Sequence, residues 1–307
     1  MTAYALRRLA HAIPTLFVVV TLSFFLIRLA PGGPFDLERP LPPAAMENLA
    51  RLYGLDQPLV VQYGRYLAGL ARGDLGPSFS FRDLTVADLL ARGLPVSMAL
   101  GALALALALL LGLALGTLAA FRRGRLADRL VGLGASLGLA VPNFVVAPLL
   151  QIVFGLTLAW LPVGGWEGGD PRHLVLPVVT LALPQVAAIA RLTRAAMGEV
   201  LGQPYIRTLR AVGLPPWRVA LHALRGALLP VIATLGPVAA ALLTGSVVVE
   251  TIFGLPGIGR TFVDGALNRD YTLVMGTVVL VAVMVVAFNL IADLAAAIVD
   301  PRLRLGA

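Results

Sequence analysis

One pattern in the chain is typical of a catalytic nucleophile. Gly134-Ala135-Ser136-Leu137-Gly138 fits G-x-S-x-G, in which a serine attacks an acyl group with the help of a histidine base. The three histidines, His11, His173 and His222, lie in different segments near the expected membrane surfaces. An intramembrane serine hydrolase that uses Ser136 is therefore an alternative function, and the less favoured one.

The glycines of this pattern have a second interpretation. Gly134 and Gly138 are four residues apart, as are Gly112 and Gly116. Small residues at this spacing let two membrane helices approach closely. We favour helix packing over chemistry for both pairs.

Residue types that are missing exclude other chemistry. The chain has no Cys, which rules out disulfides and Cys-ligated zinc, and three scattered histidines do not form a metal site. It also has no Lys, so it lacks the phosphate-binding lysine of a P-loop. We predict no metal, no bound cofactor and no ATP hydrolysis by the chain itself.

Several polar side chains lie within or near apolar segments, where such groups are functional candidates by default. They are Asn143, Gln185, Glu250, Asn289 and Asp293. Glu250 precedes a Gly/Pro turn, so it either orders that turn or lines a substrate entrance. For Asp293 a structural salt bridge near the cytoplasmic interface is favoured over a functional role.

The elements that must position these residues are membrane helices. Of the 307 residues, 59% are hydrophobic and only 13% are charged, and the mean hydropathy is +0.89. Soluble domains are about a quarter charged. The net charge of +8 comes from arginines that flank apolar runs, so we do not expect nucleic-acid binding. The apolar runs predict an all-α fold with about six spanning helices, near 12–29, 97–120, 130–158, 174–190, 227–249 and 272–298.

The distribution of arginine predicts the orientation. Fourteen Arg flank the spans on the side of both termini, against three in the short loops opposite, which places both termini in the cytoplasm. We expect an anchor helix over 1–30, an extracytoplasmic helical cap over 31–93, a five-helix core over 94–299 and a cytoplasmic tail over 300–307. Within the cap, Gly54 and Gly73 are predicted helix ends, and Thr85 with Asp88 forms a predicted capping box.

The cytoplasmic loop 191–225 contains a short amphipathic helix. Pro204 suits its first turn and Gly213 the position just after its end. Tyr205, Leu209 and Val212 share one apolar face, and Arg207 and Arg210 point away from it. Such a helix is either an interfacial anchor or a docking element for a soluble partner.

Two stretches of this loop carry a family resemblance. Tyr205 to Gly213, which reads YIRTLRAVG, and His222 to Pro230, which reads HALRGALLP, resemble the cytoplasmic loop of permease subunits of ABC importers in the peptide and nickel branch. Where that branch usually has a lysine, this chain has Val212. Further matches in the right order are YGLDQP at 53–58, GDLG at 73–76, LPVGG at 161–165, ETIFGLPGIG at 250–259 and DPR at 300–302.

The resemblance implies a type I importer permease. This chain would form half of the pathway, paired with a second, paralogous permease, above two ATPase subunits that bind ATP and Mg²⁺, and an extracytoplasmic solute-binding protein would deliver the substrate. Di- or oligopeptides are the expected substrates, with nickel or another small solute as the alternative. The residues that it implies for coupling to the ATPase are Tyr205, Ile206, Arg207, Leu209, Arg210 and Gly213. The candidates for an outer turn or the pathway are Glu250, Phe253, Pro256, Gly257, Asn143, Asn289 and Asp293.

Overall fold

The computed structural model describes residues 2–29, 32–34, 42–81 and 83–299, which form helices joined by turns. An isolated bridge joins Pro77 and Thr85. The predicted tail over 300–307 lies outside the described residues. The helices in chain order are α1 (Thr2–Leu29), α2 (Pro43–Leu52), α3 (Leu59–Ala71), α4 (Val86–Phe121), α5 (Leu126–Ala140), α6 (Asn143–Leu150), α7 (Arg172–Leu201), α8 (Pro204–Ala211), α9 (Pro216–Leu243), α10 (Val247–Phe253), α11 (Ile258–Leu267) and α12 (Tyr271–Val299).

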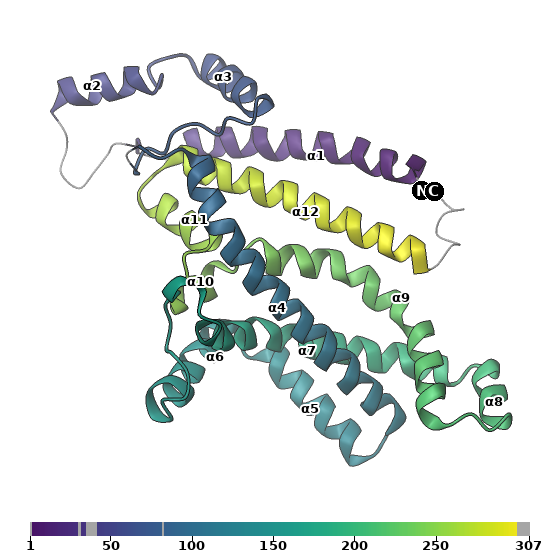
Figure 1. The fold of residues 1–307 in the computed structure, drawn as a ribbon. Helices are drawn as coiled ribbons and strands as arrows, with labels where there is room; N and C mark the ends of the chain where they lie inside the picture. The colour runs from purple at the N-terminus through teal and green to yellow at the C-terminus, as the bar shows by residue number, and fades with distance from the viewer. Residues whose placement is uncertain (1, 30–31, 35–41, 82, 300–307) are drawn as a thin grey trace.

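The long helices are arranged as expected for a membrane protein. Five segments of the described chain are long and apolar enough to cross a bilayer, and a bent helix pair makes a sixth. Helices α4, α7, α9 and α12 form a packed bundle, and α1 lies along α12 (Figure 1). The beginning of α1 and the end of α12 lie at the same end of the molecule as α8, whereas α2 and α3 lie toward the opposite end.

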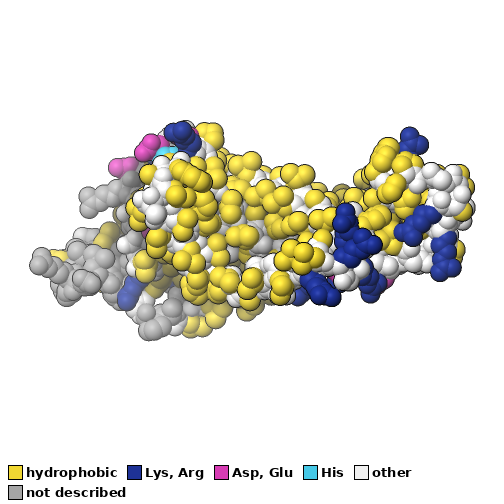
Figure 2. Space-filling view, turned by 90° about the horizontal axis from the view of Figure 1, so that it is seen from below, with side chains coloured by type: hydrophobic (Ala, Val, Ile, Leu, Met, Phe, Trp, Pro, Cys, Tyr) yellow, Lys and Arg dark blue, Asp and Glu magenta, His cyan; other side chains and the backbone are white. Residues whose placement is uncertain are grey.

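The surface supports this arrangement. Figure 2 shows a nearly continuous apolar surface along the middle of the molecule, with arginine side chains gathered toward the end that carries α8. Many of the large apolar side chains on the spans are exposed, including Leu110 at 69% and Leu137 at 64%. In water this surface would be unfavourable, so lipid or partner subunits must cover it.

The predicted third span, 130–158, is not one continuous helix. Helix α5 and the segment Asn143–Thr157 meet at an angle of 103°. Val141 has an extended backbone, with φ −87° and ψ 118°, because a residue that precedes proline avoids the α conformation. After α6 the chain continues as a π-helix over Gln151–Thr157. Pro142 thus breaks the helix outright, whereas Pro177 and Pro184 lie within the unbroken helix α7.

Predicted helix ends agree with the structure. Thr85 and Asp88 form the expected capping box at the start of α4, and Gly54 and Gly73, which follow the cap helices, have φ of +64° and +77°. Because α4 already begins at Val86, the expected boundary between cap and core at 93/94 falls inside a continuous helix. The cap and the core therefore share an element.

Glycines of α4 let neighbouring helices approach its backbone. A Cβ atom at Gly112 would lie 2.7 Å from side-chain carbons of Ile189 on α7, and one at Gly116 would lie 2.6 Å from Thr193 Cβ. Gly138 on α5 also lies against α7, whereas a Cβ at Gly134 would meet no atom within 4 Å. Close packing against α7 therefore accounts for Gly112, Gly116 and Gly138, but not for Gly134.

A stability prediction follows from a fifth glycine. A Cβ at Gly101 on α4 would collide with the backbone of Leu242 on α9. Gly101→Ala should therefore lower the stability of the folded chain by about 1–3 kcal/mol, the usual cost of overpacking. Gly134→Ala is the matched control, since it adds the same methyl group to a helix in open space and should be neutral or stabilising. Thermal unfolding in detergent measures both, and equal midpoints for the two variants would contradict the prediction.

Candidate functional site

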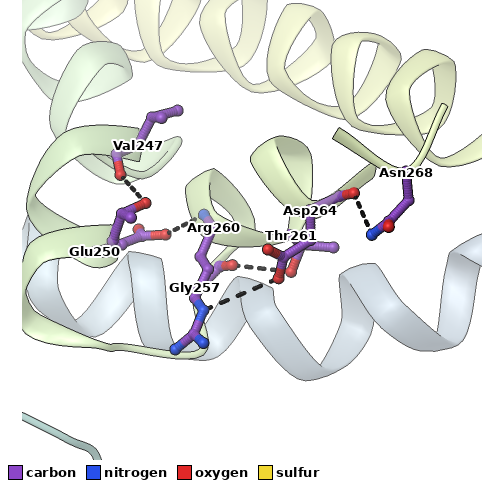
Figure 3. Close-up of polar contacts among 8 residues, drawn as sticks. Val247, Glu250, Gly257, Arg260, Thr261, Asp264 and Asn268 are labelled. Carbon is purple, nitrogen blue, oxygen red and sulfur yellow. Dashed lines mark hydrogen bonds and ion pairs between the residues drawn. The ribbon is translucent and has the colours of Figure 1, made fainter. Parts of the chain in front are cut away.

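The outer turn after α10 is built around the buried carboxylate of Glu250. Helix α10 begins after Ser246, whose side chain accepts a hydrogen bond from the Val249 N–H. This start places Glu250 in the first turn, where its side chain is fully buried. The Glu250 Oε1 atom accepts a hydrogen bond from Ser97 Oγ at 2.7 Å. Its Oε2 atom accepts one from the Arg260 N–H at 3.1 Å (Figure 3). The carboxylate therefore ties α10 to α4 and to the start of α11.

The Gly/Pro turn closes over this carboxylate. Gly254 ends α10 with φ +67°, in the left-handed region that favours glycine. A Cβ at Gly257 would collide with the carboxylate of Glu250, so only glycine lets the backbone pass this close. The Ile258 N–H donates to Ser97 Oγ at 2.8 Å, which completes the network. Of the two roles expected for Glu250, this geometry matches the ordering of the turn, because the side chain is enclosed within the chain.

The preceding outer loop is attached to the same turn. The Gly165 N–H donates to the carbonyl of the buried Phe253 at 2.7 Å. His173 Nδ1 lies 2.7 Å from the carbonyl oxygen of Gly164. Pro256, by contrast, is exposed at the apex of the turn. The outer turn thus joins segments from both halves of the chain and leaves Pro256 exposed.

The remaining polar candidates do not converge on this turn. Asn289 lies on α12 and faces α9, where a Cβ at Gly236 would be 2.7 Å from Asn289 Oδ1. Asp293 lies one turn further along α12. Asn143 begins α6, at the break of the third span, and its buried Oδ1 atom has no hydrogen-bond partner. These side chains do not form one site within this chain.

No catalytic or metal centre emerges from the described residues. None of their hydrogen bonds joins Ser136 to a histidine, and His173 is instead paired with a backbone carbonyl. No three His, Asp or Glu side chains of the described chain come together as metal ligands.

Asp270 is a structural residue that the sequence reasoning missed. Its buried carboxylate accepts hydrogen bonds from the backbone N–H of Phe79, Ser80 and Leu273 at 3.0–3.1 Å, and from the hydroxyl groups of Ser78 and Thr272. It therefore joins the loop before α4 to the start of α12. An aspartate directly before a long apolar run is a typical N-cap signal, and that signal was available in the sequence.

The amphipathic helix α8 is present where predicted, with Pro204 in its first turn and Gly213 at φ +82° after its end. The side of the helix that is buried is not the apolar face predicted from the sequence. Ile206 is fully buried against Met197 of α7 and Val219 of α9, and Leu209 packs at the edge of the same cluster. Tyr205 and Val212 instead remain 46% and 73% exposed, and Arg207 and Arg210 are exposed beside them. The helix is thus attached by one face and open on the other.

An ion pair near the α8 end of the molecule was also not predicted from the sequence. Arg194 on α7 forms an ion pair with Asp128 in the first turn of α5, and Asp128 also accepts a hydrogen bond from the Gly124 N–H at 2.9 Å. This pair holds the turn between α4 and α5 against α7. The sequence shows an acidic residue among four arginines there, which was the available signal.

Comparison with known proteins agrees with this organisation. Residues 112–305 match the family described as binding-protein-dependent transport system inner membrane component, and residues 1–101 match its N-terminal family. The chain is 50% identical over 305 residues to an oligopeptide transport system permease protein, OppB, of Salmonella typhimurium, covering 99% of this chain and 100% of that protein. It is 43% identical over 306 residues to a dipeptide transport system permease protein, DppB, of Bacillus subtilis, covering 99% of each chain.

The network around Glu250 gives a testable prediction. Glu250→Gln replaces one acceptor oxygen by an NH₂ group, so either Ser97 or a backbone N–H of the turn loses its acceptor. A buried donor left without a partner costs about 1–3 kcal/mol, so the unfolding midpoint of the variant in detergent should fall. Glu47→Gln is the control, because Glu47 takes part only in an exposed pair with Arg51 on α2. A Glu250→Gln midpoint equal to that of the control would show that the carboxylate does not hold the turn.

Proposed function

The chain belongs to the binding-protein-dependent transport system inner membrane components, and we propose that it is a permease subunit of an ATP-driven importer of di- or oligopeptides. The observation that carries the proposal is its 50% identity to an oligopeptide permease protein over the full length of both chains. The match to a dipeptide permease protein supports the same substrate class. In this proposal the chain supplies half of the pathway, and a second, paralogous permease supplies the other half.

Energy must come from other subunits. The chain has no Lys and therefore no P-loop, so we assign ATP and Mg²⁺ to two ATPase subunits on the cytoplasmic side. An extracytoplasmic solute-binding protein delivers the peptide. Transport then follows from a change in helix packing between inward-facing and outward-facing states, which the ATPase subunits bias.

Helix α8 is the proposed docking element for an ATPase subunit. An isolated helix of eight residues is not stable in water, because helix nucleation is costly, and here the buried side chain of Ile206 holds it in place. The opposite side presents the apolar surface of Tyr205 and Val212 and the charges of Arg207 and Arg210. A groove with an acidic rim would complement that surface.

The attachment of α8 explains how docking could drive transport. Ile206 packs against residues of both α7 and α9, two of the spanning helices. A displacement of α8 by the ATPase must therefore be passed to both. Gly213, with φ +82°, fixes the direction in which the chain leaves α8 toward α9.

The docking surface can be tested apart from the attachment. Val212→Asp places a charge on an exposed position, so the subunit should still fold and insert. If Val212 is buried at the interface, the change should weaken the ATPase complex at least about tenfold, since burial of such a side chain is worth about 1.5–3 kcal/mol. Co-purification of the ATPase and peptide-stimulated ATP hydrolysis measure the effect. Arg122→Ala, at an exposed position of the turn after α4, should retain both, and wild-type coupling in Val212→Asp would refute the assignment.

The orientation is tested by labelling. The native chain has no Cys, so Thr208→Cys on α8 and Glu47→Cys on α2 each introduce a single exposed thiol. With both termini in the cytoplasm, an impermeant maleimide applied from outside should label position 47 in intact cells and leave position 208 unlabelled until the cells are opened. Labelling of position 208 from outside would reverse the proposed topology.

A further inference from the structure

A groove of about 560 Å³ runs along the contact between α5 and α7. On α5 its lining extends from Asp128 to Ser136, a length of about 12 Å at 1.5 Å per residue, and on α7 it includes Ala190, Arg191 and Arg194. Both helices lie at the lower side of the bundle in Figure 1, and Figure 2 shows this side, with arginine side chains next to apolar surface. The peptide-transport function proposed above does not use this groove.

The two ends of the groove differ in polarity. Its charged end is formed by Arg129 and Arg191, which are exposed, and by the ion pair of Asp128 with Arg194. Beyond this end the lining consists of small or apolar residues: Val131, Gly132, Leu133, Ala135, Ser136 and Ala190. A ligand that has a charged group at one end and an apolar chain complements both parts.

Positive charge is in excess at the charged end. The Arg194 side chain donates two hydrogen bonds to the carboxylate of Asp128, which also accepts one from the Gly124 N–H, so this carboxylate is occupied. No carboxylate of the described residues forms an ion pair with Arg129 or Arg191. These two exposed guanidinium groups are thus left without an acidic partner in the described chain, and an oxyanion is the ligand group that suits their donors.

The depth of these groups in the bilayer indicates the source of the anion. Arg129 and Arg191 directly flank the apolar runs of α5 and α7, near 130–158 and 174–190, so they lie at the level of the lipid headgroups. The apolar part of the groove lies deeper, at the level of the acyl chains, and Leu133 in its wall is 63% exposed. Basic pockets between membrane helices on the cytoplasmic side are typical sites for anionic headgroups.

We propose that this groove binds an anionic phospholipid of the cytoplasmic leaflet. The phosphate group lies at Arg129 and Arg191, and one acyl chain lies along Gly132 and Ala135. The leaflet follows from the topology proposed above, whereas the class of lipid follows from the charge and depth of the groove. Because the headgroup contacts one arginine on each helix, the lipid adds a second connection between α5 and α7, beside the ion pair of Asp128 and Arg194.

The experiment compares two glycines of α5. A Cβ atom at Gly132 or at Gly134 would meet no atom within 4 Å, but Gly132 lines the groove and Gly134 does not. Gly132→Leu therefore fills the groove, and Gly134→Leu is the matched control. Each full-length protein is delipidated in detergent and titrated with dioleoylphosphatidylglycerol, and native mass spectrometry measures the affinity of the tightest site. Gly132→Leu should bind about tenfold more weakly than wild type and Gly134→Leu, as expected when about two methylene groups of the lipid are displaced, and equal affinities would overturn the proposal.

The charged end is tested separately. Arg191→Gln should lower the affinity for the same lipid about fivefold, as expected for the loss of one arginine beside an anionic headgroup. Arg122→Gln, at an exposed position outside the groove, is the control and should bind like wild type. Dioleoylglycerol, which has the same chains without phosphate, should bind equally to wild type and Arg191→Gln. Wild-type affinity for the phospholipid in Arg191→Gln would refute the site, even if Gly132→Leu did not fold.

Two further arms separate the lipid from other occupants. sn-Glycerol 3-phosphate, which has the phosphate group without chains, should not displace the lipid, and displacement would reassign the groove to a small soluble anion. The second permease should co-purify with Gly132→Leu as it does with Gly134→Leu. Loss of co-purification in Gly132→Leu alone would assign the groove to the contact between the two permeases and overturn the proposal. None of these measurements depends on the transported substrate, so the lipid site can fail while the transport function stands.

Discussion

A chain within or at the edge of a bilayer must satisfy its backbone hydrogen bonds from its own groups wherever water is absent. Within helices the backbone does this itself, and the difficulty arises where helices stop. In this protein buried acidic side chains accept hydrogen bonds from backbone N–H groups near the helix ends. Glu250 receives the N–H of Arg260, and Asp270 receives three N–H groups from two separate segments. These carboxylates allow an irregular outer surface to exist on an otherwise helical membrane protein.

Much of the helical architecture could be predicted from the sequence because its causes are local. Apolar runs, the Thr85–Asp88 capping box and the position of Gly213 each depend on neighbouring residues, and the described residues contain the predicted helices, with the third span broken into two. The sequence predicts a single third span near 130–158, which the structure breaks at Pro142. Whether a proline bends or interrupts a helix depends on what packs around it, and Pro177 and Pro184 remain inside α7 because that helix is packed on several sides.

The site was less predictable because its contacts join distant residues. Ser97 and Glu250 are 153 residues apart, and Ser78 and Asp270 are 192 apart, so no local pattern announces them. The same limit applies to α8. Helical periodicity put Tyr205, Leu209 and Val212 on one face, but it did not show which apolar residues the chain would bury itself. Ile206 and Leu209 contribute to the chain's own packing, which leaves Tyr205 and Val212 for a partner.

Helix α4 has 36 residues and therefore a length of about 54 Å, well beyond the roughly 30 Å of the hydrocarbon core. Its first turn belongs to the outer cap, and its last turn reaches the arginine-rich turn that Asp128 and Arg194 hold against α7. The helix is continuous over this whole length, with Pro95 inside it. The cap and the turn between α4 and α5, which lie at opposite ends of the molecule, are therefore parts of one continuous element, and this gives a displacement at either end a direct path to the other.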